Sequence, residues 1–152
     1  MLLLWRLPPC WLACKVLAGP ILQPQAADGL RCLARAAGLV NTNNRWCQVD
    51  WVTMESTAAP GIHVLGDATF SAPAMPKSGH MANQHGKTAA AAIVELMNGR
   101  APKPMMMANT CYSFVDDQRV IHVASVHRYD ADKKTMQTVP GSGGVSTAPS
   151  PL

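Results

Sequence analysis

The sequence predicts an α/β (α+β) fold in which a strand, a turn and a long helix are followed by a small antiparallel sheet. Residues 61–100 run from the short apolar stretch IHVLGD through a Pro-Lys-Ser-Gly turn into an alanine-rich segment. Further along, strand-like stretches are separated by Asp-rich turns. The chain has 152 residues, of which 48% are hydrophobic, so it is long enough to bury a core.

The amino-terminal segment, residues 1–36, gives the weakest signals. Its opening, MLLLWRLPPCWLACKVLAG, starts like a signal peptide. Charged residues and prolines interrupt the apolar stretch, however, and no small-x-small cleavage site follows. The stretch is also too short and too broken to span a bilayer. The segment therefore does not establish export, and no membrane span is predicted.

Three local elements are expected before residue 60. Residues 29–38 place apolar side chains at helical spacing and end at Gly38, which predicts a short helix. The Asn-rich residues 41–46 form a turn, and residues 47–56 alternate like an extended strand. Trp46 and Trp51 are expected to pack in the core, because large aromatic side chains dominate cores.

The central elements are a buried strand over residues 62–67 and a helix over residues 78–97. The strand is apolar and delivers Asp67 at its carboxyl end. Ser78 is the expected N-cap of the helix, and Gly99 follows its end. The many alanines of this helix permit close approach to a neighbouring backbone.

The remaining residues predict a small antiparallel sheet. Its strands are TCYSFV (110–115), RVIHVASVHRY (119–129) and TMQTV (135–139), with turns at DDQ and DADKK. The last segment, PGSGGVSTAPSPL, is too poor in apolar residues to order itself. We expect it to lie on another surface or to stay mobile.

Charge and cysteine content exclude several classes of protein. The formal net charge is +4, and the basic residues are scattered, which disfavours nucleic-acid binding. The five cysteines form no CxxC or CxxCH motif, so neither a zinc ribbon nor an attached haem is indicated. No metal site is predicted: His122 and His127 are five apart in a strand and face opposite sides. His80 and His85 are assigned to a polar helix face.

The order strand, Gly-Asp, turn and helix suits one kind of ligand. Asp67 can accept hydrogen bonds from a sugar or ribityl hydroxyl, and Gly66 lets the backbone come close. The start of the helix near Ser78 attracts an electron-rich group. By itself Gly-Asp is more often a simple turn in which the aspartate is an N-cap.

The stretches GIHVLGDA, AMPKSGHMANQHGKTAAAAIVELMNG and NTCYSFV together resemble the flavoprotein chain of the flavocytochrome c sulfide dehydrogenase family. GLVNTNNRWCQVDWVTMES and SGGVS are similar to it as well, so the likeness spans residues 37–146 and is poor before them. It implies the C-terminal part of a two-dinucleotide-binding-domain flavoprotein. Residues 37–100 would end the FAD-binding domain, 101–146 would form a small antiparallel domain, and 147–152 a tail.

The resemblance also implies roles for individual residues. Asp67, in the family's GDA motif, would bind the ribityl chain of FAD, with Gly66 beside it. The backbone of Met75, Pro76, Lys77 and Ser78 would face the flavin, with Lys77 adding positive charge. Cys111 would be half of a redox-active disulfide that sulfide attacks. Electrons would then leave through a c-type cytochrome subunit, in the periplasm.

The sequence departs from the family in two ways. It contains no GxGxxG, the motif that normally holds the FAD pyrophosphate. The second redox cysteine belongs to an upstream region that does not match, and Cys47 is only a weak candidate to replace it. We therefore expect a fragment that is inactive alone. Two alternatives stay open: a non-catalytic interaction module for a cytochrome or flavoprotein, and part of an NAD(P)H-dependent flavin disulfide reductase.

Overall fold

The computed structural model describes residues 33–146 and 148–151. The signal-like opening and most of segment 1–36 lie outside the described residues. Of the helix predicted over 29–38, residues 33–36 are helical, and Gly38 ends the turn with φ +70°. The named elements are η1 (Gly66–Ala68), α3 (Gly79–Met97), β1 (Met107–Phe114), β2 (Arg119–Asp130), β3 (Thr135–Thr138), β4 (Gly144–Val145) and β5 (Ser150–Pro151).

Helix α3 confirms the long helix predicted from the alanine-rich segment. Ser78 is its N-cap, and the Ser78 side chain accepts a hydrogen bond from the Met81 N–H at 3.0 Å. Gly99 follows the C-cap with φ +67°. The face turned to the core carries residues at spacings of three and four, as an amphipathic helix requires; they are Met81, His85, Thr88, Ala89 and Ala92.

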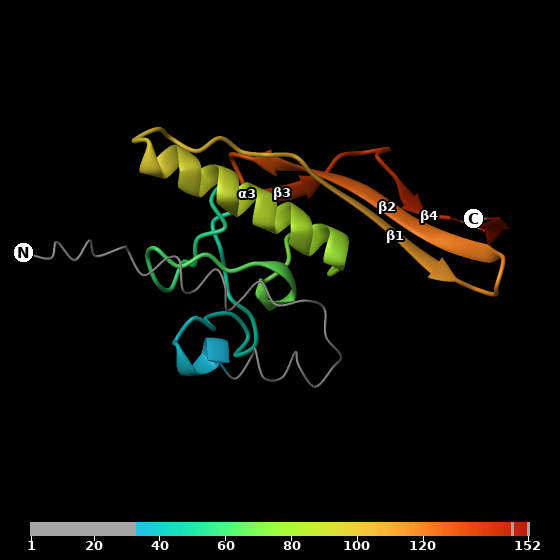
Figure 1. Cartoon of the computed structure of the whole chain (residues 1–152), viewed down its shortest axis with the longest axis horizontal. Helices are drawn as coiled ribbons and strands as arrows, with labels where there is room; N and C mark the ends of the chain where they lie inside the picture. The colour runs from blue at the N-terminus through green and yellow to red at the C-terminus, as the bar shows by residue number, and fades with distance from the viewer. Residues whose placement is uncertain (1–32, 147, 152) are drawn as a thin grey trace, which may run out of the picture.

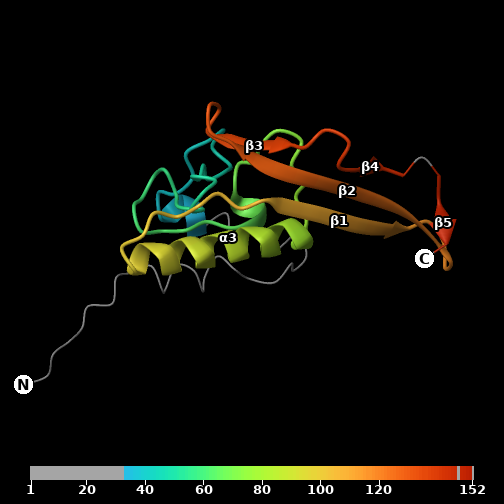
Figure 2. The same ribbon diagram turned by 90° about the horizontal axis from the view of Figure 1, so that it is seen from above.

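The predicted antiparallel sheet is also confirmed. β1 pairs with β2 from Met107 opposite His127 to Phe114 opposite Val120, and β2 pairs with β3. The short strands β4 and β5 pair with β2, so part of the glycine- and proline-rich segment lies on the sheet. Figures 1 and 2 show α3 beside the first part of β1, while the β1–β2 hairpin extends past the amino-terminal end of the helix.

The strand predicted over residues 47–56 is wrong, because the chain reverses within it. The Asp50 side chain accepts hydrogen bonds from the N–H groups of Val52 and Thr53 at 2.8 and 3.0 Å. Met54 then adopts φ +60°. The reversal brings Val49 into an isolated antiparallel bridge with Ser56. An aspartate that bonds its own backbone offers a turn in place of a ladder.

Residues 63–65, the middle of the segment predicted as a buried strand over 62–67, are buried, but the segment does not form a regular strand. His63 makes one antiparallel bridge with Glu55, and the Val64 N–H donates to the Met54 carbonyl at 2.9 Å. Val64 and Leu65 are 0% and 8% exposed. A strand needs a continuous partner, and the described residues supply only these single pairings. The chain then enters the short 3-10 turn η1, which contains Asp67.

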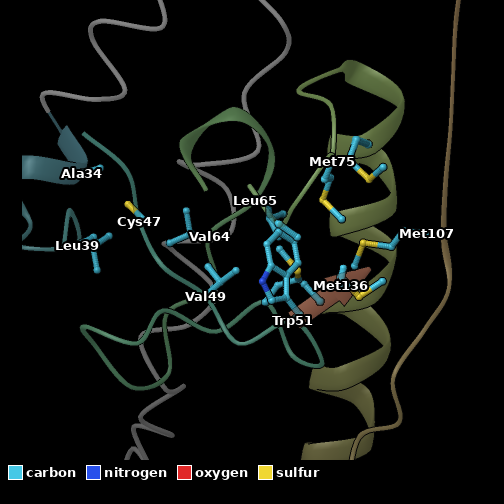
Figure 3. Packing of buried hydrophobic residues seen from close by; sticks show 14 residues of the cluster. Ala34, Leu39, Cys47, Val49, Trp51, Val64, Leu65, Met75, Met107 and Met136 are labelled. Atoms are coloured by element: carbon cyan, nitrogen blue, oxygen red, sulfur yellow. The ribbon is translucent and has the colours of Figure 1, made fainter. Parts of the chain in front are cut away.

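One hydrophobic core joins the helix, the sheet and the irregular segment before residue 75 (Figure 3). Trp51, at 6% exposed, lies in it as predicted. Methionines fill much of this core, since a flexible thioether adapts to irregular gaps; the buried ones are Met54, Met75, Met81, Met107 and Met136. Residues of 37–100 and 101–146 therefore pack as one unit. Within the described part of the chain, no helix is long and apolar enough to cross a bilayer.

Candidate functional site

The Gly-Asp-Ala turn lies against the helix and presents Asp67 to solvent. Gly66 has φ +64°, a conformation that side chains other than glycine's rarely adopt. The Gly66 carbonyl accepts hydrogen bonds from the N–H and the hydroxyl of Thr69, at 3.1 and 2.8 Å. These bonds close the turn, so the exposed carboxylate of Asp67 stands on a fixed backbone.

Gly66 also lies close to α3. A Cβ at this position would lie 3.2 Å from the Cβ of Ala82. The glycine therefore permits contact with the helix. Its N–H is already bonded to a side chain of that helix, so Gly66 would serve a ligand by shaping the turn.

That side chain is His85, which the sequence analysis placed on a polar helix face. This assignment is wrong: His85 is 3% exposed, and its Nδ1 accepts the Gly66 N–H at 3.1 Å. Nδ1 is therefore unprotonated, and the proton of the neutral ring is on Nε2, which has no partner within the structure described. Burial, aided by the positive charge of Lys77, lowers the pKa of His85 to about 4. Its position four residues after Met81, on the apolar stripe, was the available signal.

Lys77 also holds this turn through hydrogen bonds. Its Nζ donates to the carbonyls of Asp67 and Thr69, at 2.9 and 2.7 Å, and lies 3.9 Å from the ring centroid of Trp46. Partial burial of the ammonium lowers the pKa of Lys77, the charge of Asp67 opposes this shift, and the charge of Arg45 adds to it. Trp46 was predicted to pack in the core, and this prediction is wrong. Its ring is only partly buried and contacts the Lys77 ammonium.

The residues between the turn and the helix have different surroundings. Met75 is 6% exposed, and its N–H donates to the Ala72 carbonyl at 3.0 Å. Pro76 has no N–H to offer. The N–H groups of Gly79 and His80, the first two of α3, have no hydrogen-bond partner among residues 33–146 and 148–151. They form the electropositive end of a 19-residue helix, which attracts an electron-rich group.

Cys111 lies beside this helix end, connected to it by a residue that the sequence analysis did not select. The Cys111 Sγ is 3.4 Å from Oδ1 of Asn109. The same Oδ1 accepts the Ser78 hydroxyl at 2.5 Å. Because residues two apart in a strand face the same side, Asn109 and Cys111 both turn toward the N-cap. Cys111 is partly exposed and is not in a disulfide.

His80 provides a second connection between the helix and β1. The Thr110 N–H donates to His80 Nδ1 at 3.1 Å. This N–H lies on the edge of β1 away from β2, so the helix covers an otherwise open donor of the strand. Together with the bond between Ser78 and Asn109, it fixes the strand that carries Cys111 against the start of α3.

Cys47 does not take the place of a second redox cysteine. It is 1% exposed and free, and burial raises the pKa of its thiol, which makes it a poor nucleophile. No group of three or more His, Cys, Asp or Glu in the described residues could hold a metal ion.

The structure thus brings the predicted residues together around one helix end. The consecutive residues Lys77 and Ser78 reach in two directions: Lys77 holds the turn that contains Asp67, and Ser78 holds Asn109 next to Cys111. Met75 belongs to the core. The arrangement offers one exposed carboxylate, two open N–H groups and one thiol.

Comparison with known families identifies the last part of the chain. Residues 102–151 match the family model described as flavocytochrome c sulphide dehydrogenase, flavin-binding. The match covers the last third of the chain, including Asn109 and Cys111, and it confirms the resemblance there. It supports a flavoprotein with FAD as the cofactor, and the family description implies a cytochrome partner.

Proposed function

We propose that this chain forms one side of the flavin site of an FAD-dependent sulfide dehydrogenase that passes electrons to a c-type cytochrome. The observation that supports it is the connection from the thiol of Cys111 through Asn109 to Ser78, the N-cap of α3. A thiol at this position lies beside the helix end that attracts electron density. The family's known setting suggests the periplasm as the compartment.

Each residue of the site has a part in binding the flavin. The exposed Asp67 carboxylate would accept hydrogen bonds from the ribityl hydroxyls, and Gly66 gives the turn its shape. The open N–H groups of Gly79 and His80 would interact with the pyrimidine edge of the flavin, where the helix end would stabilise negative charge by about 0.5 to 2 kcal/mol. The backbone from Met75 to Ser78 leads into this edge.

Cys111 performs the sulfur chemistry in a disulfide with a second cysteine. Hydrosulfide attacks that disulfide, so a new S–S bond forms as the old one breaks and one cysteine leaves as thiolate. The outer sulfur of the persulfide then leaves as zero-valent sulfur, so the two cysteines remain as a thiol and a thiolate. Loss of two electrons and one proton from this pair re-forms the disulfide. FAD, when bound, would supply the acceptor for that electron pair and proton, and a c-type cytochrome would be the onward electron acceptor.

The test combines binding and reduction. The test uses the full-length flavoprotein in which these residues are joined to the second redox cysteine; it is loaded with FAD and mixed with sulfide without oxygen while its visible flavin absorbance is followed. We expect Cys111→Ser to bind FAD like the wild type and to lose bleaching by sulfide. Ser113→Ala, two residues further on the same exposed strand, is the matched control and keeps it. Full bleaching in Cys111→Ser contradicts the role of the cysteine.

A non-catalytic interaction module is the second candidate, and the hairpin gives it specific support. Tyr112, Phe114 and Val145 are 58%, 64% and 65% exposed, so the sheet carries apolar side chains in water. Folded protein that binds no FAD favours this module. Bleaching by NADH or NADPH in place of sulfide favours a flavin disulfide reductase.

A further inference from the structure

The amide of Asn109 is buried with only one of its two ends bonded. Asn109 is 1% exposed, and its Oδ1 faces both the Ser78 hydroxyl and the Cys111 Sγ. Its Nδ2 has no partner among the described residues. A buried amide N–H without a partner is costly, so such a group calls for an explanation.

We propose that Asn109 is a positioning residue that holds the Cys111 sulfur in both of its protonation states by turning its amide about χ2. With the thiol present, Oδ1 accepts the S–H, as the structure shows. When the proton leaves to solvent, the amide turns and Nδ2 donates to the thiolate. The two ends of an amide are similar in size, so the exchange needs no repacking.

The turned amide can use both hydrogens of Asn109 Nδ2, which have no partner when the thiol is present. After the turn, one Nδ2 hydrogen points to the sulfur and the other to the Ser78 Oγ, which already accepts from the Met81 N–H and has a second lone pair. Both Nδ2 hydrogens are then used. The Ser78 hydroxyl gives up its bond to Oδ1, but Ser78 is partly exposed, so this hydrogen can turn to solvent. The oxygen left in the buried position lacks a donor, which is less costly than a buried donor without an acceptor.

Among the described residues, Asn109 is the side chain that is hydrogen-bonded to the Cys111 sulfur. Opposite Cys111 on β2 is Val123, which also pairs with β4 at Val145. The neighbours Tyr112 and His122 lie on the other face of the hairpin. Neither nearby basic side chain is bonded to the sulfur: His80 of α3 binds the Thr110 backbone, and Lys77, which precedes α3, is bonded to the Gly-Asp-Ala turn. No charged side chain is therefore bonded to Cys111 in the described residues.

This inference rests on the proposed function for its biological meaning, because attack on a disulfide leaves a thiolate that must be stabilised. Its test is independent of flavin and sulfide. The rate of iodoacetamide alkylation at Cys111 is measured in the full chain by mass spectrometry of the Cys111 peptide, which separates it from the other cysteines. Rates are compared at pH 7 and at pH 10, where an ordinary thiol is ionised.

We expect Asn109→Leu to lower the rate at pH 7 roughly tenfold, the effect of losing one hydrogen bond to a charged group, and to leave the rate at pH 10 almost unchanged. Asn109→Asp keeps the shape and places a carboxylate by the sulfur, so it lowers the rate at pH 7 further. Thr110→Val, on the opposite face, is the control and behaves like the wild type.

Two results would overturn the proposal. The first is a ratio of the two rates that stays at the wild-type value in both Asn109 variants. The second is an equal change at both pH values, which indicates altered access to the sulfur. Asn109→Asp keeps the test decisive if Asn109→Leu fails to fold. Neither result bears on whether the chain binds FAD, so failure here is distinguishable from failure of the proposed function.

Discussion

His85 accepts the backbone N–H of Gly66 at 3.1 Å, so a neutral imidazole from the helix holds the turn that carries Asp67. The bond joins residues 19 apart in the chain. It works only while His85 Nδ1 is unprotonated, because a protonated ring has no lone pair to offer. The geometry of the candidate site is therefore coupled to pH.

We predict that acid destabilises the fold through His85. The pKa of His85 is lowered to about 4 in the folded chain, while an unfolded histidine takes its proton near 6.5. The unfolded state thus binds more protons in this window, and stability is lost as the pH falls from about 6.5 to 4. The loss amounts to about 3 kcal/mol. Urea unfolding at pH 7 and pH 4 measures it.

His85→Gln is the matched variant, since its amide oxygen can still accept the Gly66 N–H but does not titrate. Burial also lowers the pKa of His127, which adds pH dependence of the same sign in both proteins. The difference between the proteins isolates His85. If His85→Gln loses as much stability between the two pH values as the wild type, the histidine is not the titrating group.

Gly66→Ala should destabilise the fold by about 1–2 kcal/mol, the cost of a left-handed conformation for a residue with a Cβ. The new Cβ would also lie 3.2 Å from the Cβ of Ala82, which is shorter than an ordinary van der Waals contact. Gly86→Ala, in α3, is the control. Its Cβ meets nothing within 4 Å, and helix propensity predicts that the free energy of unfolding rises by up to about 1 kcal/mol. Equal effects in thermal unfolding would refute the argument.

The regular elements could be predicted from the sequence because local signals agree with their burial. Helix α3 has a serine cap, an apolar stripe and a glycine after its end, and each is a local property. The β1–β2 hairpin likewise turns where Asp116 accepts the N–H groups of Gln118 and Arg119. In these elements tertiary packing reinforces the choice that neighbouring residues already make.

The remaining features depend on partners far apart in the chain. His85 lies on the apolar stripe of α3, but its bond to Gly66, 19 residues earlier, cannot be read from its neighbours in the sequence. Asn109 acquires its role from Ser78, 31 residues earlier. The false strand over residues 47–56 had the right alternation, but the side chain of Asp50 bonds its own backbone and reverses the chain. Alternation reports burial, and it does not detect such a competing turn.

Lys77→Met should lower the free energy of unfolding by about 1 kcal/mol, because it removes the contact with Trp46 and two hydrogen bonds to carbonyls. Lys87→Met is the control of equal charge change, at an exposed position of α3. Urea unfolding compares the two. A loss of the same size in Lys87→Met would show that net charge, and not these contacts, is responsible.

Asp67→Asn should weaken FAD binding roughly tenfold while leaving stability nearly unchanged. The Asp67 carboxylate is exposed, whereas its backbone is held by Lys77, so the substitution alters what the turn presents and not how it folds. A carboxylate accepts stronger hydrogen bonds from hydroxyls than an amide does, and bonds to charged groups contribute about 1.5–3 kcal/mol. Flavin fluorescence titration gives the affinities. Asp117→Asn, in the exposed turn between β1 and β2, controls for lost charge, and an equal loss of affinity there would remove Asp67 from the binding site.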